Sequence, residues 1–538
     1  MFFGDNLNVL RDHFLSESVD LIYLDPPFNS KRDYNVLFKS PKGHASDAQI
    51  TAFEDAWEWG DQAEREYAEL LHQENTDVAE MIESMRRFLK ETPIMAYLVM
   101  MANRLLELHR VLKPSGSIYL HCDPTASHYL KIILDTIFCP EYFQNEIIWQ
   151  RTAVKGDVRR KFGAVHDVIY FYSKTENYKF QSVFQIPDED YHSRFRFDDH
   201  DGRGPYQSAP LDSPNPRPNL TYEYKGYPPP TKGWRVSLDL MKQLDEEGRL
   251  IFPPTLSGRL RRKVYLKEQQ GPKVADVWTD IIPLQGSSSE RLGFPTQKPL
   301  ALLERIINSS SNPGDLVLDP FCGCGTAVHA AQKLGREWAG IDITHLAISL
   351  IEKRMKDAFP GIQFDVVGTP KDLGGARNLA ERDKYQFQWW ACALVGAQPY
   401  QGKKKGADTG IDGMIFFQDD AKGAKKIIVS VKGGEHVTRT MIADLKNSVE
   451  REKAQIGLFV TLTPPTKPME HEAVSAGYYE SPHMGAYPKI QILTIEGLLA
   501  GYQKPQYPDF AKGGLSFKKA KLEKKEGIQP GLGFENLD

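Results

Sequence analysis

The sequence predicts an α/β fold in which two distant parts of the chain build one open sheet, followed by a second, smaller α/β domain. Val19–Leu24 is apolar, aromatic or β-branched apart from one acid, which is typical of a buried parallel strand. Residues 317–343 run as strand, glycine turn, helix and strand, the pattern of a βαβ unit. After about residue 370 the composition changes and a new alternation of helix and strand patterns begins.

The first strand ends in the turn Asp25, Pro26, Pro27 and Phe28. Two prolines stop the strand because neither donates a hydrogen bond to a ladder. A carboxylate, rigid carbonyls and an aromatic ring therefore lie at the carboxyl end of a strand, where open α/β sheets bind ligands. Asp25 and a proline carbonyl would accept both N–H bonds of a planar amine, and Phe28 would stack on its ring. A strand followed by a simple Pro-Pro turn is the structural alternative.

The insertion that follows, about residues 38–91, is rich in Asp, Glu, Gln and Ala. Residues 53–59 and those after them predict surface helices, either a solvated cover or a lid that closes over the site. Ser117–Asp123 predicts the next parallel strand. We expect His121 and Asp123 at its end to line the floor of a pocket, with His121 as a proton acceptor the alternative.

The strand at residues 317–319 runs into a glycine-rich turn, and Asp342 lies near the end of the strand after it. Gly323 and Gly325 allow a ligand to approach the backbone closely, and an acid in this place suits a ribose diol. The turn lacks the third glycine of a dinucleotide fingerprint and the lysine of a phosphate loop. A nucleoside ligand without a pyrophosphate therefore fits better than NAD or ATP.

Together the two motifs resemble the circularly permuted (β-class) amino-methyltransferases of DNA, in which a D-P-P-[YF] turn precedes the S-adenosylmethionine turn D-P-F-x-G-x-G-T. The resemblance covers roughly residues 1–365 and includes four further motifs. It implies a Rossmann-like S-adenosylmethionine-dependent methyltransferase fold with an inserted target-recognition region, acting on double-stranded DNA. The further motifs are Gly4–Leu7, His121–Pro124, Gly233–Arg235 and Pro295–Pro299.

The resemblance also implies roles for single residues. It makes Asp25, Pro26, Pro27 and Phe28 the catalytic turn. It places Asp5 beside the adenine of the cofactor, where a helix N-cap is the structural alternative. The methionine part would meet Lys298 at its carboxylate and Asp319 at its amino group. The implied cofactor-binding residues are Asp5, Lys298, Asp319, Phe321, Gly323, Gly325, Thr326 and Asp342.

An aspartate-led turn is associated in this family mainly with adenine and a serine-led one mainly with cytosine. We therefore expect N6-adenine methylation within a restriction-modification or related defence system, with N4-cytosine methylation as the alternative. The target base has to leave the duplex to present its amine. Stacking on Phe28 would offset part of that cost.

Residues 151–290 combine prolines, tyrosines and basic residues, so long regular elements are excluded there. Given the resemblance, this segment is the target-recognition region, in which Lys and Arg contact phosphates. A solvated basic face is the alternative. The expected DNA-binding residues are Arg159, Arg160, Arg261 and Arg262.

The C-terminal part carries Asp412 at a turn into a strand and Lys432 at the end of the strand 426–432. This resembles the PD-(D/E)xK nuclease fold, in particular Mrr-like restriction domains, in which acids hold Mg²⁺ and the lysine helps to activate water. Ser430 stands where that family has Glu or Gln, which removes a ligand for a hard cation. An active nuclease with Asp412 as metal ligand, a DNA-binding relic and a structural domain are the three alternatives.

Five domains follow: 1–150 (catalytic half), 151–290 (target recognition), 291–368 (cofactor half), 376–505 (nuclease-like) and 506–538 (flexible tail), with Lys371–Gly375 as a linker. The net charge of −4 means that DNA binding depends on local basic patches. Five cysteines without a CxxC pair argue against a zinc site or disulfides and favour a reducing cytoplasm. No apolar run reaches the ~18 residues of a membrane span. A homodimer and restriction-system subunits are both compatible with the sequence.

Overall fold

The computed structural model describes the chain except residues 28–32, 40–44, 55–57, 74, 155–159, 161, 286–287, 289, 293, 295, 401–409, 420–423, 509–519 and 524–538, and the side chains of 33–39 and 45–54. It forms two compact units. One contains Met1–Gln181 and Asp276–Asp538, and the other is Ser182–Ala275. The second unit is therefore an insertion into the first.

The central sheet has eight strands in the order β1-β13-β12-β2-β5-β7-β6-β11. Strands β12 and β2 pair in parallel, with Val317 opposite Leu21 and Leu318 opposite Ile22, so the two distant parts of the chain join in one sheet as predicted. Strand β7 is antiparallel to both of its neighbours. The strands are β1 (Phe2–Phe3), β2 (Val19–Leu24), β5 (Leu112–Cys122), β6 (Phe143–Gln150), β7 (His166–Ser173), β11 (Val277–Trp278), β12 (Leu316–Asp319) and β13 (Glu337–Asp342).

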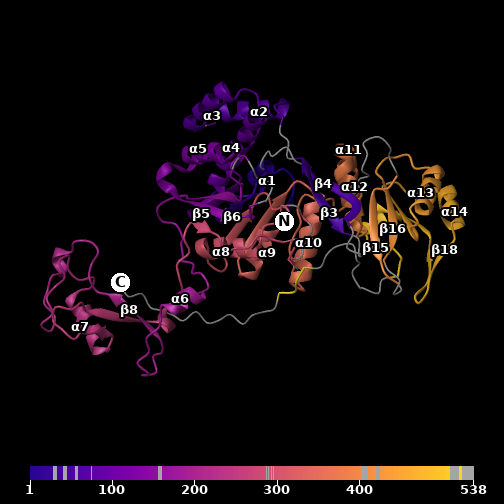
Figure 1. The fold of residues 1–538 in the computed structure, drawn as a ribbon. Coiled ribbons are helices and arrows are strands. Elements are labelled where there is room, and N and C mark those ends of the chain that lie inside the picture. The colour runs from indigo at the N-terminus through magenta and orange to yellow at the C-terminus, as the bar shows by residue number, and fades with distance from the viewer. Residues whose placement is uncertain are drawn as a thin grey trace. The chain divides into compact units, whose positions relative to one another are not determined.

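Two layers of helices cover this sheet (Figure 1). Helices α1, α4 and α5 share a large apolar core with β2, β5 and β7. Helices α8 and α9 pack on each other, and α9 and α10 contact β13. This is the Rossmann-like fold that the sequence predicts. The helices are α1 (Asn6–His13), α4 (Pro93–Val111), α5 (Ser127–Phe138), α8 (Leu300–Ser310), α9 (Thr326–Lys333) and α10 (His345–Ala358), with the 3-10 turn η1 (Pro140–Tyr142).

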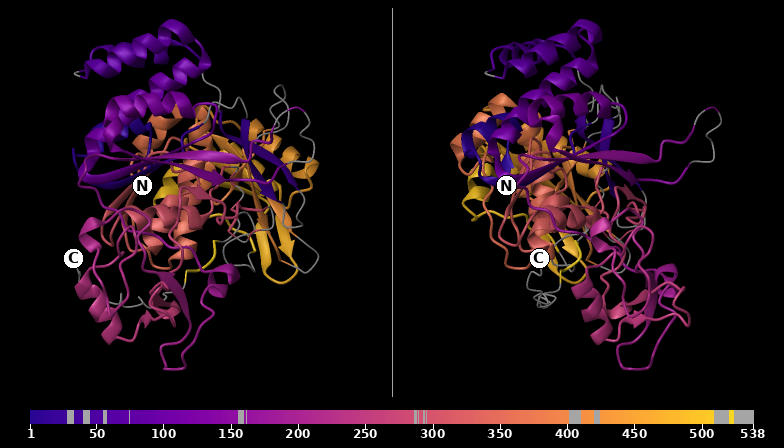
Figure 2. Two further views of the ribbon diagram at one scale, coloured as in Figure 1. Left: turned by 60° about the vertical axis from the view of Figure 1, so that its left-hand side comes forward. Right: turned by 90° about the vertical axis from the view of Figure 1, so that its left-hand side faces the viewer.

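The insertion after the first turn forms a hairpin and two helices. Strands β3 (Asp33–Lys39) and β4 (Ala45–Glu54) pair with each other, so the helix predicted from residue 53 is wrong at its start. Helices α2 (Asp61–Leu71) and α3 (Thr76–Leu89) pack on α4, as the views in Figure 2 show. They bury Leu70, Val78 and Ile82 completely, so these helices are part of the folded core.

The inserted unit has short elements, as its prolines predict. Its sheet has the order β8-β10-β9. Trp234, Met241 and Leu260 lie in its small core. The elements are α6 (Glu189–Ser193), β8 (Tyr206–Pro210), η2 (Pro218–Leu220), α7 (Leu238–Glu246), β9 (Leu250–Ile251), β10 (Arg261–Tyr265) and η3 (Leu266–Glu268).

The C-terminal part is a smaller α/β domain with a five-stranded sheet in the order β14-β15-β16-β17-β20. The predicted linker is wrong beyond Asp372, because the Asp372 side chain accepts a hydrogen bond from Gly375 N and caps α11. No helix in the described part of the chain is long and apolar enough to cross a membrane. The elements are α11 (Leu373–Arg382), α12 (Lys384–Leu394), β14 (Gln398–Pro399), β15 (Gly413–Phe417), β16 (Lys425–Lys432), α13 (Arg439–Arg451), β17 (Ile456–Thr461), α14 (Lys467–Ser475), β18 (Tyr478–Ser481), β19 (Gly485–Pro488), β20 (Ile490–Thr494) and α15 (Ile495–Leu499).

Candidate active site

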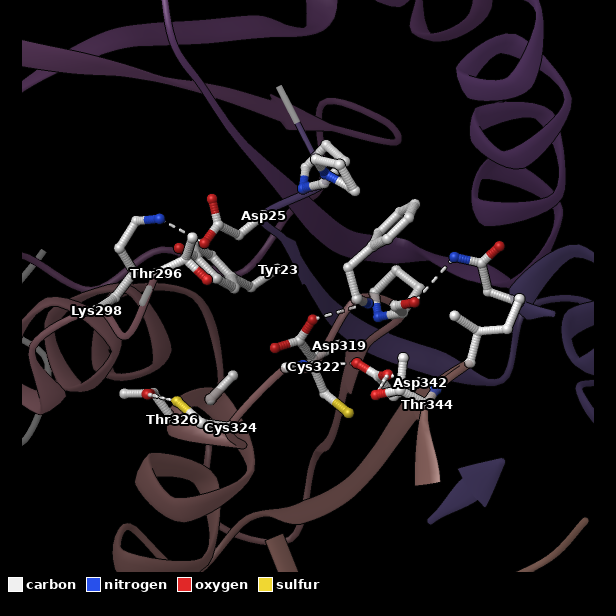
Figure 3. A pocket seen from close by; sticks show the side chains of 18 of the residues that line it. Tyr23, Asp25, Thr296, Lys298, Asp319, Cys322, Cys324, Thr326, Asp342 and Thr344 are labelled. Carbon is white, nitrogen blue, oxygen red and sulfur yellow. Dashed lines mark hydrogen bonds and ion pairs between the residues drawn. The ribbon is translucent and has the colours of Figure 1, made fainter. Parts of the chain in front are cut away.

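A cavity of about 250 Å³ lies at the carboxyl ends of β2, β12 and β13 (Figure 3). Both predicted motifs line it, which follows from the parallel pairing of these three strands. Of the predicted residues, the lining contains Asp5, Asp25, Pro26, Pro27, Lys298, Asp319, Phe321, Gly323, Thr326 and Asp342.

The two carboxylate oxygens of Asp25 differ in their surroundings. Oδ2 forms an ion pair with the Lys298 ammonium group, and both side chains are largely buried. Oδ1 is buried and has no hydrogen-bond partner among the described residues. A buried acceptor without a donor is costly, so this oxygen is suited to a donor that arrives with a ligand. Phe28, the last residue of the predicted turn, lies outside the described residues.

Lys298 directly precedes Pro299, the N-cap of α8. We predict for it a role at the methionine carboxylate of the cofactor, and the structure shows its ammonium group against Asp25. It therefore links the chain before α8 to the turn that follows β2. Its role toward the cofactor stays a prediction.

Asp319 and Asp342 end the two neighbouring strands β12 and β13. Asp319 Oδ1 accepts a hydrogen bond from Phe321 N at 3.1 Å. Burial, with the nearby charges of Asp25 and Asp342, raises the pKa of Asp319 well above its ordinary value. A buried carboxylate in this condition is stabilised by a cationic ligand, such as an amino group.

Asp342 is held by three hydrogen bonds from the chain. Oδ2 accepts from Gly323 N at 3.0 Å. Oδ1 accepts from the backbone N and the hydroxyl of Thr344, each at 2.8 Å. Burial nevertheless raises the pKa of Asp342 to about 6. Asp342 also lines the cavity, and an acid at the end of this strand suits a ribose diol.

The two glycines of the turn have different roles. Both have positive φ, 49° at Gly323 and 72° at Gly325. Gly323 lines the cavity, and a Cβ there would approach the Phe294 ring at 3.2 Å. A Cβ at Gly325 would meet the Ile351 side chain at 2.8 Å. The predicted cofactor role of Gly325 is therefore indirect, because this residue allows α10 to pack closely behind the turn.

Asp5 is the N-cap of α1 and lines the cavity, and its place beside the adenine of the cofactor stays a prediction. One oxygen caps α1 by accepting from Leu7 N and Asn8 N, and the other forms an ion pair with Arg104 at 2.7 Å. Arg104 also donates to the Asn6 side-chain oxygen, and Asn6 donates to the Pro320 carbonyl at 2.9 Å. Sequence reasoning missed Arg104 and Asn6. A lone arginine inside the apolar run of α4 was the available signal.

His121 lies behind the cavity wall and not on its floor. Its side chain is completely buried, with Nδ1 at 2.9 Å from the Tyr23 hydroxyl and Nε2 at 3.2 Å from Asp167 Oδ2. Against the effect of burial, the hydrogen bond from His121 lowers the pKa of Asp167. His121 Nε2 therefore donates to a carboxylate, and Nδ1 accepts from Tyr23. Asp123, also expected on the floor, accepts from Thr125 N at the turn before α5.

The predicted DNA-binding arginines lie in different settings. Arg160 is exposed in the first unit, whereas Arg261 and Arg262 belong to β10 of the inserted unit. Arg261 donates to the Ser208 hydroxyl and carbonyl, each at 2.6 Å, so it is tied to the neighbouring strand. Arg159 lies outside the described residues. Their role toward DNA stays a prediction.

The nuclease-like residues come together on β16 and the turn before β15. Asp412 Oδ2 accepts a hydrogen bond from Val431 N at 2.6 Å. Ser430 is buried on β16, and Lys432 ends that strand. Within the described ranges, no group of three or more His, Cys, Asp or Glu is placed to hold a metal ion. The expectation of Mg²⁺ at Asp412 therefore has no support from the described residues.

The open sheet, the glycine turn and the strand-end carboxylates define the class of Rossmann-like methyltransferase folds. The family model described as DNA methylase, of the N6/N4 methyltransferase type, matches residues 19–353, and the chain belongs to this family. A second model, NACHT-associated inactive Restriction Endonuclease 1, matches residues 387–499.

Two curated relatives illustrate the similarity. Type II methyltransferase M.EcaI of Enterobacter cloacae is 34% identical over 261 residues, which are 48% of this chain and 57% of the relative. The Type III restriction-modification enzyme StyLTI Mod subunit of Salmonella typhimurium is 24% identical over 359 residues, which are 63% of this chain and 50% of the relative. The chain thus spans about half the length of these relatives.

The solved structures are less similar to this chain in sequence than the two relatives are. The M1.HpyAVI–SAM complex has a TM-score of 0.30 at 16% identity, covering 66% of this chain and 99% of that chain. PvuII DNA methyltransferase (cytosine-N4-specific) has a TM-score of 0.31 at 12% identity, covering 67% of this chain and 86% of that chain. Likeness at this level carries no argument about the reaction.

Proposed function

We propose that this protein is a site-specific DNA methyltransferase that moves a methyl group from S-adenosylmethionine to the exocyclic N6 amine of a flipped adenine in duplex DNA. One observation carries the proposal. Asp25, whose Oδ1 is buried and unsatisfied among the described residues, lines the same cavity as Asp319, Asp342 and the glycine turn. The proposed hydrogen-bond acceptor for the target amine and the proposed nucleoside site therefore lie in one cavity.

The chain's contribution to the reaction is to hold and position the amine. An exocyclic amine is conjugated with its ring and weakly nucleophilic. Asp25 Oδ1 and the Pro26 carbonyl would accept its two hydrogens and favour the pyramidal, reactive form. Lys298 fixes the other oxygen of Asp25, so that Oδ1 keeps one direction. Such positioning supplies much of the rate of a bimolecular transfer.

The residues around the cavity fit the cofactor. Bound S-adenosylmethionine supplies an activated methyl group on a sulfonium. Asp342 would accept from the ribose hydroxyls, Asp319 from the amino group, and Asp5 would lie near the adenine. Phe321, Gly323 and Thr326 would line the wall, and Lys298 lies within the same cavity.

The second candidate is N4-cytosine methylation, because the matched family includes both products. Cytosine and adenine present the same amine to an acid and a carbonyl. The aspartate at the head of the turn favours adenine, by resemblance alone.

Methyl transfer with labelled cofactor, followed by analysis of the nucleosides, tests both points. We expect N6-methyladenine in unmodified DNA and none with Asp25→Ala. N4-methylcytosine would replace the first candidate by the second. An Asp25→Ala variant with full activity would refute the mechanism. Sequencing DNA from cells that express the protein would identify the recognition site.

We further infer a circularly permuted arrangement, because the catalytic turn precedes the cofactor turn along the chain. We propose a role in a restriction-modification or defence system, in the cytoplasm where DNA lies. Size-exclusion chromatography with and without DNA would distinguish a monomer, a homodimer and a complex with restriction subunits.

For the C-terminal domain we propose a nuclease-like fold that binds DNA without cutting it. Asp412 accepts a backbone hydrogen bond, and Ser430 brings no charge to a cation. Incubation of plasmid DNA with Mg²⁺ should leave it intact. Cleavage that disappears with Lys432→Ala would show instead that the protein is both methyltransferase and nuclease.

A further inference from the structure

A buried arginine that is not part of the cavity lining holds the glycine turn. Arg354, on α10, donates from Nη1 to the Cys324 carbonyl at 3.0 Å and to the Thr326 hydroxyl at 3.2 Å. Cys324 and Thr326 both line the cavity, and Arg354 is 3% exposed. The guanidinium group therefore sets the position of the turn that faces the cofactor site.

A histidine on α9 continues this network. Arg354 Nε donates to His329 Nδ1 at 3.1 Å, so the proton of the neutral ring lies on Nε2. His329 Nε2 then donates to Glu523 Oε1 at 3.0 Å. Burial and the neighbouring Arg354 lower the pKa of His329 to about 4, which keeps the ring neutral at pH 7.

Glu523 comes from a short C-terminal segment, residues 520–523, which lies between two stretches outside the described residues. Its backbone N donates to the Ala358 carbonyl at the end of α10, at 3.0 Å. Its carboxylate also lies 3.7 Å from the Lys333 ammonium group on α9. One residue thus joins the two helices that flank the glycine turn.

We propose that residues 520–523 form a latch that fixes the cofactor turn through Glu523, His329 and Arg354. Glu523 is then a positioning residue for cofactor binding, although it is distant in sequence from the glycine turn and does not line the cavity. That the ligand is S-adenosylmethionine rests on the proposed function. The latch rests on the hydrogen bonds that join Glu523, His329 and Arg354.

Removal of the Glu523 carboxylate would leave the His329 Nε2–H buried without an acceptor. The imidazole would shift to find one, Arg354 would lose a fixed acceptor, and the turn would loosen. Arg354 is enclosed by protein, so its replacement would disturb folding. Glu523, at the edge of the network, is the better position to change.

The test uses the full chain and titrates S-adenosylmethionine by calorimetry. We expect Glu523→Ala to raise the Kd about tenfold, while KM for DNA stays unchanged. Glu523→Gln should restore most of the affinity, because its amide oxygen still accepts from His329. Glu480→Ala, an exposed change on β18, is the matched control and should have no effect.

Hydrogen exchange of residues 322–328 is measured in parallel without cofactor. Faster exchange in Glu523→Ala but not in Glu523→Gln supports the latch. Unchanged exchange and unchanged cofactor affinity in Glu523→Ala would overturn it. A wild-type protein that binds no S-adenosylmethionine would refute the proposed function, while the exchange data would still decide the latch.

Discussion

At the scale of residues, the decisive feature is that the two carboxylate oxygens of Asp25 have different partners. One oxygen is paired with Lys298, and the other is buried and unsatisfied among the described residues. An ion pair that fixes a carboxylate also fixes the direction of its second oxygen. We therefore expect Lys298 to act through Asp25 as well as at the cofactor.

Replacement of Lys298 separates these two roles. We expect Lys298→Met to lower kcat at saturating cofactor by about 10²-fold, because the Asp25 carboxylate loses its fixed geometry. Steady-state kinetics at several cofactor concentrations measure this effect. A variant whose kcat recovers fully at high S-adenosylmethionine would assign Lys298 to cofactor binding alone.

The pKa of Asp342, about 6, predicts that cofactor affinity depends on pH. Above pH 6 the carboxylate is charged and would accept from the ribose hydroxyls of the proposed cofactor, whereas below pH 6 it is protonated and the ligand would have to displace that proton. Affinity should therefore fall by up to about tenfold per pH unit below 6. Calorimetry from pH 5 to 8 measures the dependence. Asp342→Asn should bind weakly with a flatter profile, and a wild-type profile that is flat to pH 5 would contradict the assignment.

The sequence allowed prediction of Asp25, Asp319 and Asp342, because acids at the ends of neighbouring parallel strands have to meet at one edge of the sheet. It did not allow prediction of the Arg104–Asp5 and Lys298–Asp25 pairs. Those contacts depend on how α4 and the chain before α8 pack against the sheet, which no local pattern encodes.

At the scale of elements, α2 and α3 are the surface helices that the sequence predicts after residue 53. Their acidic composition did not show that each helix has an apolar face packed on α4. The start of the predicted helix at residue 53 was wrong because that stretch pairs in a hairpin. The predicted linker was wrong beyond Asp372, because the side chain of this residue caps α11 and the first turn of the helix includes Gly374 and Gly375.

Two adjacent leucines of α2 test whether this helix belongs to the core. Leu70 is fully buried, whereas Leu71 is 39% exposed. We expect Leu70→Ala to lower the free energy of unfolding by about 2–4 kcal/mol. Leu71→Ala should lower it by less than ~1 kcal/mol. Denaturant unfolding of both variants gives the comparison, and equal small effects would mean that α2 is a detachable cover.

At the scale of the whole molecule, two separate parts of the chain supply the strands of the central sheet. Residues 1–181 supply β2, which ends at the Asp25 turn, and residues after 275 supply β12 and β13 beside it. The inserted unit, Ser182–Ala275, lies between these two parts in the sequence. The fold class could be predicted because both parts carry strong local motifs, whereas the start of the insertion at residue 182 has no comparable signal.

We expect methyl transfer by the whole protein to be independent of divalent metal ions. Transfer from a sulfonium releases a neutral thioether, so no anionic leaving group has to be stabilised. Methyl transfer in excess EDTA should equal that in Mg²⁺. Activity lost in EDTA and restored by Mg²⁺ would require a metal-dependent step in one of the two domains.

The most direct test of the shared cavity is the single-turnover rate of Asp25→Asn on unmodified DNA. This change keeps the size of the side chain but removes its charge and one acceptor. We predict a rate at least about 10²-fold below wild type. We also predict cofactor affinity within about threefold of wild type, because Asp25 acts on the amine and not on the cofactor. A variant that transfers methyl groups at the wild-type rate would contradict the claim that this acid grips the reacting amine.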